Sequence, residues 1–345
     1  KWETSETLNL GFDATLLNGK WEVVLDVWRK DTRDLLFGVP LPAVVGPSAS
    51  APAVNVAKMR NQGIDMQVIN RGNITSDIKY ELTFNNSFLK NEIVAFAPGV
   101  TNLTGGAFPG ITPVRMEVGR SLSSFYGYQV IGYFNSAAEV ASSPAQDGKG
   151  LGRFRYADIN GDGKITTDDR TYLGSPVPTY TGGINVGLTY KDFEFATYLY
   201  ASAGNKIWNQ SKWFTDFFGT FEGSGKGERA KQSWTPALGN AAEAPIWESA
   251  SNISTSGAEN SWYIEDGDYI RFQNISLGYN VPEKYSSKLG IKRAKFTVSA
   301  TNLFTITAYK GLDPGVGGAA DTGFGIDVGN YPVTRGFNAS INLNF

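Results

Sequence analysis

Hydrophobic and polar residues alternate along much of this chain with a period of two. From Leu8 to Leu16 every second residue is apolar, and the residues between them are polar or glycine. Side chains alternate between the two faces of a β-strand, so this pattern predicts a strand with one apolar and one polar face. The pattern returns in eight more segments, at residues 21–27, 64–68, 78–84, 184–190, 193–199, 270–279, 296–300 and 337–345. The chain is therefore predicted to be all-β.

Turn and bulge signals lie between and within these segments. Asn18-Gly19 joins the first two segments, and this dipeptide favours a tight two-residue hairpin turn. In segment 270–279 the apolar phase slips at Gln273-Asn274, which predicts a β-bulge at that point.

The connections between the predicted strands alternate between short and long. Short connections lie near residues 17–20, 71–76, 190–192 and 281–293, and long ones near 31–60, 93–178, 202–262 and 305–333. Short periplasmic turns and long extracellular loops are typical of outer-membrane β-barrels, and each strand is near the ~10 residues that cross a bilayer when tilted. Aromatic residues recur near strand ends, as in interfacial girdles, at Trp21, Tyr190, Tyr269, Tyr279 and Phe345.

A soluble β-sandwich would show the same alternation, because one face of each of its sheets is buried. The regular succession of short and long connections and the aromatic strand ends favour the membrane barrel. About nine strands is an odd number, whereas bacterial single-chain barrels have even numbers. The first residue is Lys1 rather than a start Met. The chain is therefore interpreted as part of a longer protein, with further strands before the first.

Composition narrows the range of functions. The 345 residues include no histidine and no cysteine, which excludes zinc sites built on those ligands, Ser-His-Asp or Cys-His catalysis, and disulfide bonds. The formal net charge of −2 argues against a nucleic-acid partner. Charged residues make up only 19% of the chain and glycines number 40, so an ordinary soluble enzyme is not expected.

Several segments resemble, in their order and spacing, the C-terminal part of SusC/RagA-type TonB-dependent outer-membrane transporters. They are residues 55–65 (NVAKMRNQGID), 123–135 (SSFYGYQVIGYFN), 158–195, 262–282 and 300–314. The resemblance covers essentially the whole chain. It implies the C-terminal strands of a 22-stranded transmembrane antiparallel β-barrel with long extracellular loops. It also implies the outer membrane of a Gram-negative, Bacteroidota-type bacterium.

The resemblance further implies a function and partners. It predicts TonB-dependent import of an oligomeric nutrient, glycan or peptide, together with a SusD-like surface lipoprotein, and no enzymatic activity. An N-terminal plug, the remaining barrel strands, the TonB complex and outer-membrane lipid are the other implied partners. Two alternatives stay open. One is a secreted or surface β-rich glycan-binding module stabilised by calcium, and the other is half of a passive porin without a plug.

Residues 158–169 (DINGDGKITTDD) have the pattern of a calcium-binding loop. Oxygen ligands recur at alternate positions, Gly163 permits a sharp turn, and Asp169 stands where a bidentate Glu is usual. The predicted ligands are Asp158, Asn160, Asp162, the carbonyl of Lys164, Thr166 and Asp169. A structural calcium ion is expected. The alternative is a surface turn without metal, since Asp, Asn and Gly are turn formers.

The two longest loops, 93–178 and 202–262, are also rich in aromatic residues. Loops of more than ~15 residues are usually functional, so these loops are predicted to form the extracellular contact surface for the lipoprotein or the substrate. The predicted contact residues are Tyr126, Tyr128, Tyr133, Trp213 and Phe217. The alternative is that most of the aromatic residues pack the loops together. Apolar residues at helical spacing within 205–221 predict a short amphipathic helix.

The last nine residues, FNASINLNF, alternate up to a terminal aromatic residue. By resemblance to outer-membrane proteins, these residues are predicted to belong to the signal for barrel insertion. The residues concerned are Phe337, Ile341, Leu343 and Phe345.

The apolar phase of each strand is predicted to face lipid and the polar phase to face the barrel lumen. The predicted lipid-facing residues are Leu8, Leu10, Phe12, Val23, Leu25, Leu82, Ile184, Val186, Leu188, Ile341 and Leu343. Carboxylates such as Asp13 and Asp26 then lie on the lumenal side. No catalytic residue is assigned, because nothing in the sequence fixes the distance between these carboxylates.

Overall fold

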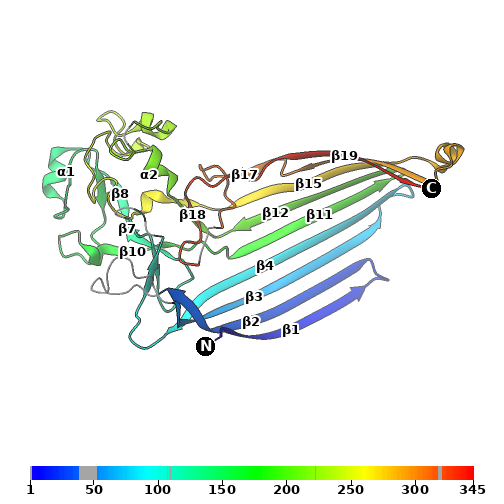
Figure 1. Cartoon of the computed structure of the whole chain (residues 1–345), viewed down its shortest axis with the longest axis horizontal. Coiled ribbons are helices and arrows are strands. Elements are labelled where there is room, and N and C mark those ends of the chain that lie inside the picture. Colours follow the sequence, from blue (N-terminus) through cyan, green and yellow to red (C-terminus); the bar gives the residue numbers. More distant parts are fainter. Residues whose placement is uncertain (1, 39–52, 107, 109–110, 222, 318–320) are drawn as a thin grey trace.

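The structure is a computed structural model that describes residues 2–38, 53–106, 108, 111–221, 223–317 and 321–345. Nine long strands form one antiparallel sheet in the order β1-β2-β3-β4-β11-β12-β15-β16-β19 (Figure 1). They are β1 (Thr4–Leu16), β2 (Trp21–Gly38), β3 (Ala53–Asn73), β4 (Ile78–Phe96), β11 (Tyr180–Tyr190), β12 (Phe193–Ala203), β15 (Tyr269–Asn280), β16 (Arg293–Thr301) and β19 (Gly336–Asn344). A short strand, β17 (Thr305–Thr307), also pairs with β15. Each of the nine segments predicted from alternation is one of these long strands.

The short connections lie together at one end of the sheet, and the long connections lie at the other (Figure 1). Asn18 and Gly19 both have positive φ, and Lys20 N donates to Leu17 O at 3.3 Å, so the predicted turn is present. The connection is nevertheless four residues long, because pairing stops at Leu16 and Trp21. The connection after β15 holds α3 (Glu283–Ser286) and the 3₁₀ helix η6 (Ser287–Leu289).

The bulge predicted in segment 270–279 is confirmed. Tyr198 of β12 pairs with Asn274, whereas the next residue, Leu199, pairs with Phe272. Gln273 is therefore the extra residue, and its carbonyl accepts a hydrogen bond from Asn302 N at 3.0 Å.

The first strands are longer than the alternation predicted. β2, β3 and β4 contain 18, 21 and 19 residues, so most of the connection expected near 31–60 is strand, and residues 39–52 lie outside the described residues. Strand pairing is made by backbone groups, so it continues beyond the point where side chains stop alternating between apolar and polar.

Directly paired residues of antiparallel strands share one face of the sheet. The register joins Leu10, Val27, Ile64 and Phe88 in one row, and similar rows of apolar residues cross the sheet as far as Ile341. This apolar face is bare: 76% of Leu10 is exposed. A soluble sandwich would bury such a face against a second sheet, so the sandwich alternative does not fit the structure.

The long connections form a separate body at one end of the sheet, here named the loop assembly, made of the described residues within 97–179, 204–268 and 308–333 (Figure 1). Its strands are β5 (Leu103–Gly105), β6 (Val114–Met116), β7 (Phe125–Tyr128), β8 (Val130–Tyr133), β9 (Phe154–Tyr156), β10 (Arg170–Gly174), β13 (Lys206–Asn209), β14 (Ile264–Asp266) and β18 (Ile326–Asp327). Its helices are α1 (Ala137–Ser142), α2 (Ser211–Thr215) and the 3₁₀ helices η2 (Thr167–Asp169), η3 (Glu228–Gln232), η4 (Gly239–Ala241) and η5 (Ser261–Tyr263).

Most of the hydrophobic core belongs to this loop assembly rather than to the sheet. Phe125, Phe154, Trp208 and Tyr263 are almost completely buried there, and Tyr128 and Tyr156 stack with ring centroids 4.8 Å apart. Among the described residues, none of the helices has the length and apolar character needed to cross a membrane. The extracellular-type loops are therefore a folded unit with its own core.

Candidate functional site

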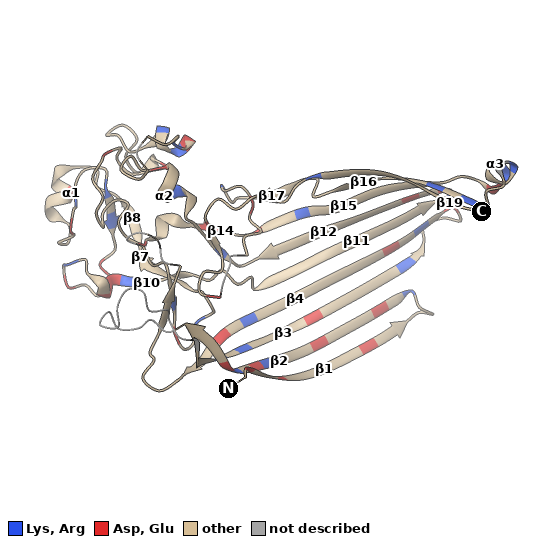
Figure 2. Cartoon of the chain, in the orientation of Figure 1, with Lys and Arg blue, Asp and Glu red and all other residues tan. Residues whose placement is uncertain are grey.

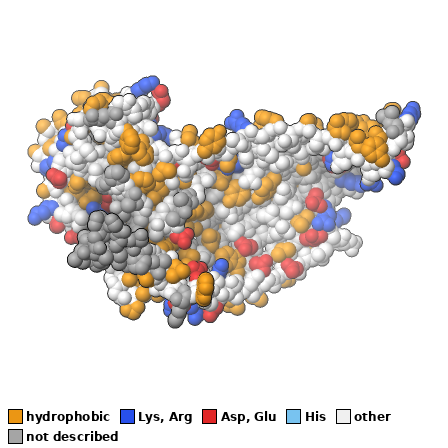
Figure 3. Space-filling model, viewed as in Figure 1, with side chains coloured by type: hydrophobic (Ala, Val, Ile, Leu, Met, Phe, Trp, Pro, Cys, Tyr) orange, Lys and Arg blue, Asp and Glu red, His pale blue; other side chains and the backbone are white. Residues whose placement is uncertain are grey.

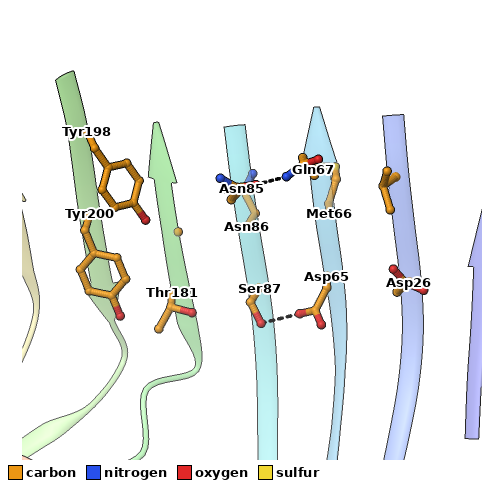
Figure 4. Close-up of a pocket in the computed structure, with 12 residues that line it drawn as sticks. Asp26, Asp65, Met66, Gln67, Asn85, Asn86, Ser87, Thr181, Tyr198 and Tyr200 are labelled. Atoms are coloured by element: carbon orange, nitrogen blue, oxygen red, sulfur yellow. Dashed lines mark hydrogen bonds between the residues drawn. The ribbon is translucent and has the colours of Figure 1, made fainter. Parts of the chain in front are cut away.

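A hollow of about 360 Å³ lies on the polar face of the sheet, across β2, β3, β4, β11 and β12 (Figure 4). Gln67 donates to Asn85 at 2.8 Å, and Ser87 donates to Asp65 at 2.5 Å. The polar side chains that line the hollow are Asp26, Asp65, Gln67, Asn85, Ser87, Thr181, Tyr198 and Tyr200. Figure 3 looks onto this face and shows acidic side chains spread over the sheet.

Asp26 and Asp65 are direct cross-strand neighbours in this hollow. Like charges in that arrangement destabilise a strand pair, and neither carboxylate has an ion pair among the described residues. Asp26 accepts from Asn9 Nδ2 at 3.0 Å, so both carboxylates are held by neutral donors. The hollow therefore offers hydrogen-bond acceptors, amides and hydroxyls to a polar solute. Charged residues are common on β1–β4 and rare on β11 and β12 (Figure 2).

The calcium-type loop wraps its backbone around Asp158. Asp158 Oδ1 accepts from Gly161 N at 2.7 Å and Oδ2 accepts from Gly163 N at 2.8 Å. Gly163 has φ of 80°, as the sharp turn requires. Asp162 N donates to Asn160 Oδ1 at 2.9 Å, so Asp158, Asn160 and Asp162 lie together. These three side chains carry the oxygen atoms that a hard cation prefers as ligands.

The second half of the loop is arranged differently. Asp169 is completely buried, and its two oxygens accept from Ile159 N at 2.9 Å and Thr166 N at 2.7 Å. It closes a capping box with Thr166 at the start of η2. Within the part of the chain that the structure describes, no three acidic side chains come together as a metal site. Calcium binding by Asp158, Asn160, Asp162, Lys164, Thr166 and Asp169 stays a prediction.

Three of the five predicted aromatic contact residues are buried in the loop assembly. Tyr128, Tyr133 and Phe217 are at most 6% exposed. Tyr133 stacks on Phe154, and Phe217 packs edge-on against Trp262 at 5.3 Å. Their side chains thus belong to the core of the loop assembly, and their contact with a partner or substrate stays a prediction.

The other two predicted contact residues are half-buried. The Tyr126 ring lies between Arg115, 4.7 Å from its centroid, and Tyr172, 5.1 Å away. Trp213 donates from its indole nitrogen to Ser256 O at 3.1 Å. Both keep part of their surface free, so they remain candidates for contact.

The predicted amphipathic helix over 205–221 is only partly present. Its first residues form strand β13, which pairs with β14 and β18, and the helix α2 covers only Ser211–Thr215. Ile207 and Trp208 are buried in the strand pairing rather than on a helix face. Tertiary pairing therefore overrides the local helical spacing at this point.

Three exposed aromatic residues of the loop assembly, Phe218, Phe221 and Trp247, are together named the aromatic ridge here, and their exposure was not predicted from the sequence. These residues are 41%, 61% and 42% exposed. Phe218 and Trp247 meet edge-on with ring centroids 5.5 Å apart. Phe217 is buried whereas its neighbour Phe218 is exposed, and nothing in the local sequence distinguishes the two.

Two ion pairs inside the loop assembly were also not predicted. Lys212 Nζ lies 2.8 Å from Glu265 Oε1, and Arg229 Nε lies 2.5 Å from Asp216 Oδ2. Burial lowers the pKa of Lys212 from its ordinary value, and the nearby Glu265 charge opposes that shift. Lys212 and Glu265 are distant in sequence, so only the folded structure brings that pair together.

The C-terminal strand β19 lies at the edge of the sheet and pairs only with β16 among the described strands. Phe337, Ile341 and Phe345 are 73%, 64% and 71% exposed, and Leu343 is 43% exposed. Their role in barrel insertion stays a prediction.

Comparison with known proteins identifies the family. Residues 1–303 match the family described as "TonB dependent receptor-like, beta-barrel". The chain is 32% identical to TonB-dependent receptor P3 of Formosa agariphila and 27% identical to TonB-dependent receptor SusC of Bacteroides thetaiotaomicron. Both alignments cover all of this chain but only 34% and 32% of the relatives. The chain thus spans about a third of the length of these relatives.

Solved structures agree with this result. The structure of the RagAB peptide transporter matches all of the chain with a TM-score of 0.80 and 22% identity, and 35% of that protein is covered. The RagAB peptide importer in its open-open state gives a TM-score of 0.76. Membership of this receptor family agrees with the predicted outer-membrane location and with the prediction that the chain is not an enzyme. The chain belongs to the TonB-dependent receptor family, as a C-terminal portion of its outer-membrane β-barrel.

Proposed function

We propose that this chain forms part of a TonB-dependent importer that carries an oligomeric nutrient across the outer membrane. The observation that carries this proposal is the sheet itself, one wall with a bare apolar face and a polar, hollowed face. Such a wall separates lipid from an aqueous lumen. Its match to a third of much longer receptors supports further strands and a plug in the complete barrel.

We also propose that the importer acts with a SusD-like surface lipoprotein and is energised by the TonB complex. The match to a solved peptide transporter named RagAB and the similarity to SusC support this assembly. Both a glycan and a peptide would find hydrogen-bonding partners in the hollow around Asp65 and Asn85. The substrate is therefore proposed as an oligomer of either class.

A growth experiment tests this function. A strain lacking the receptor is complemented with the full-length gene and supplied with oligosaccharides, oligopeptides or their monomers as the nutrient. We expect receptor-dependent growth on one oligomer class, and growth on monomers without the receptor. Growth on every oligomer without the receptor would contradict import. Growth that needs the receptor but not TonB would favour the passive porin.

The aromatic ridge is expected to contact the lipoprotein. Large aromatic side chains at the centre of an interface commonly contribute ~2 kcal/mol or more each to binding. We expect the double variant Phe221→Ala/Trp247→Ala to weaken binding of the purified lipoprotein to the full-length receptor by at least about tenfold. Titration calorimetry in detergent measures this change.

A matched control for this prediction lies at the opposite end of the sheet. Tyr285 in α3 is 54% exposed, so Tyr285→Ala removes an exposed aromatic ring far from the loop assembly. This variant should bind the lipoprotein like the wild type. Unchanged binding by the ridge variant would show that the lipoprotein docks elsewhere.

We further propose that loop 158–169 binds a structural calcium ion through the Asp158–Asp162 segment. Calcium at 100 times its Kd should stabilise the loop by about 2.7 kcal/mol, measured as slower amide hydrogen exchange in residues 158–169 of the full-length receptor. Asp162→Asn should abolish this gain, because it removes one of the clustered negative charges. Asp168→Asn removes a charge from an exposed side chain outside the predicted ligand set and should keep the gain. A wild-type loop that exchanges equally with calcium and with chelator would rule out the metal.

A further inference from the structure

A groove of about 650 Å³ lies on the apolar face of the sheet, where β1–β4 approach the loop assembly. Its apolar side is lined by Leu10, Val27, Ile64 and Phe88, and its other side by Arg29 and Lys90. The polar hollow described above is on the opposite face of the same strands. The groove is therefore distinct from the lumenal surface.

The cross-strand register orders the charges at this groove. The apolar row of Leu10, Val27, Ile64 and Phe88 is followed, toward the loop assembly, by the row Leu8, Arg29, Gln62 and Lys90. The next row is Glu6, Asp31, Arg60 and Glu92. Successive rows on one face are about 7 Å apart along a strand. Basic side chains thus border the apolar surface directly, and acidic ones lie one row farther away.

The two bordering cations are available to a ligand. The side chains of Arg29 and Lys90 are 46% and 64% exposed. Each is paired with the acidic residue two positions later in its strand: Arg29 with Asp31 at 2.6 Å, and Lys90 with Glu92 at 2.7 Å. The carboxylates therefore lie on the side away from the apolar row. The donors of both cations that do not face these carboxylates remain free for an anion.

We propose that this groove binds a phosphate-bearing lipid of the outer membrane leaflet. The acyl chains would lie along Val27, Ile64 and Phe88, in continuity with the lipid-facing surface, and the phosphate would lie between Arg29 and Lys90. Guanidinium and ammonium groups bind phosphate through charge-assisted hydrogen bonds. This site depends on the membrane placement of the apolar face and is independent of the transported substrate.

Binding of lipid A to the purified full-length receptor tests the proposal. Native mass spectrometry in detergent gives the affinity for phosphorylated lipid A and for its dephosphorylated form. We expect the double variant Arg29→Gln/Lys90→Gln to bind phosphorylated lipid A about 30-fold more weakly, because each cation near an anionic lipid surface contributes a factor of several. The dephosphorylated lipid should bind the wild type about as weakly as the phosphorylated lipid binds the double variant.

Arg33→Gln is the matched control. Arg33 is on the same strand and face, two rows beyond Arg29, and is also ion-paired, to Glu6 at 2.8 Å. This variant should keep the wild-type affinity. Equal affinity of the wild type for the two lipids, or the same loss in Arg33→Gln, would overturn the proposal. Saturable binding of inorganic phosphate alone at Arg29 and Lys90 would instead identify a free-anion site. The affinities of the wild type for the two lipids show whether the phosphate is needed for binding, even if the double variant does not fold.

Discussion

Replacing Glu265 by glutamine is expected to destabilise the loop assembly by about 3–5 kcal/mol. The side chains of Lys212 and Glu265 are only 8% and 11% exposed. Lys212 also donates to Trp262 O at 2.7 Å and lies 4.8 Å from the Trp262 ring centroid. Removing the carboxylate charge leaves the ammonium group buried without its counter-ion, which is the costly case. Amide hydrogen exchange of α2 and β14 in the full-length receptor measures the loss as a lower free energy of local opening.

Two further variants separate this effect from a general loss of charge. Glu228→Gln breaks the pair with Lys231, whose side chains are 88% and 71% exposed, and should change stability little, as surface pairs do. Lys212→Met/Glu265→Gln should be more stable than Glu265→Gln alone, because no buried charge is left. A double variant less stable than the single one would show that the charge pair is not the cause.

The same pair predicts how the loop assembly responds to acid. Burial raises the pKa of Glu265, but the Lys212 charge and hydrogen bonds from Lys212, Lys310 and Asn209 outweigh it, so the pKa lies below its ordinary value of 4.5. A carboxyl group with a depressed pKa contributes stability that is present above 4.5 and is lost as the pH falls through the folded-state pKa. The stability difference between wild type and Glu265→Gln should therefore shrink as the pH falls through the folded-state pKa of Glu265.

The sheet could be predicted from the sequence because its signal is local. Alternation from Leu8 to Leu16 reflects the two different environments on the two faces of one strand. In segment 270–279, the slip of the alternation at Gln273 marks the bulge. The ends of β2 and β3 could not be predicted in this way. From Lys30 to Asp34 both phases are polar and from Leu35 to Phe37 both are apolar, so alternation stops there, yet backbone pairing continues to Gly38 and Ala53. Side-chain pattern reports the surroundings of a strand, not the extent of its hydrogen bonding.

The interior of the loop assembly could not be predicted because its contacts join distant segments. Tyr156 stacks on Tyr128 and receives a hydrogen bond from Asn260, and Phe154 contacts both Tyr133 and Trp262. An aromatic residue in a long loop has the same local sequence whether it is buried or exposed. The structure buries Tyr128, Tyr133 and Phe217 among other aromatic residues, and contact through them stays a prediction.

Replacing Ile184 by arginine is expected to destabilise the assembled barrel by about 2–4 kcal/mol. Ile184 pairs with Phe84 on one side and with Leu199 on the other, in the middle of the apolar face. Its side chain is exposed on a face that no other layer covers, so in the outer membrane an arginine there would meet hydrocarbon. The adjacent residue Asn185 pairs with Thr83 and Tyr198 on the polar face, and Asn185→Arg places the same charge toward the lumen.

The full-length variants, folded into phospholipid vesicles and unfolded with guanidinium chloride, give the two free energies of unfolding. We expect Ile184→Arg to lose stability and Asn185→Arg to lose markedly less, because successive residues of a strand point to opposite faces. The larger loss in Asn185→Arg would mean that the polar face meets lipid and that every lipid-facing assignment on these strands is reversed. Equal losses would mean that neither face of β11 lies against the bilayer.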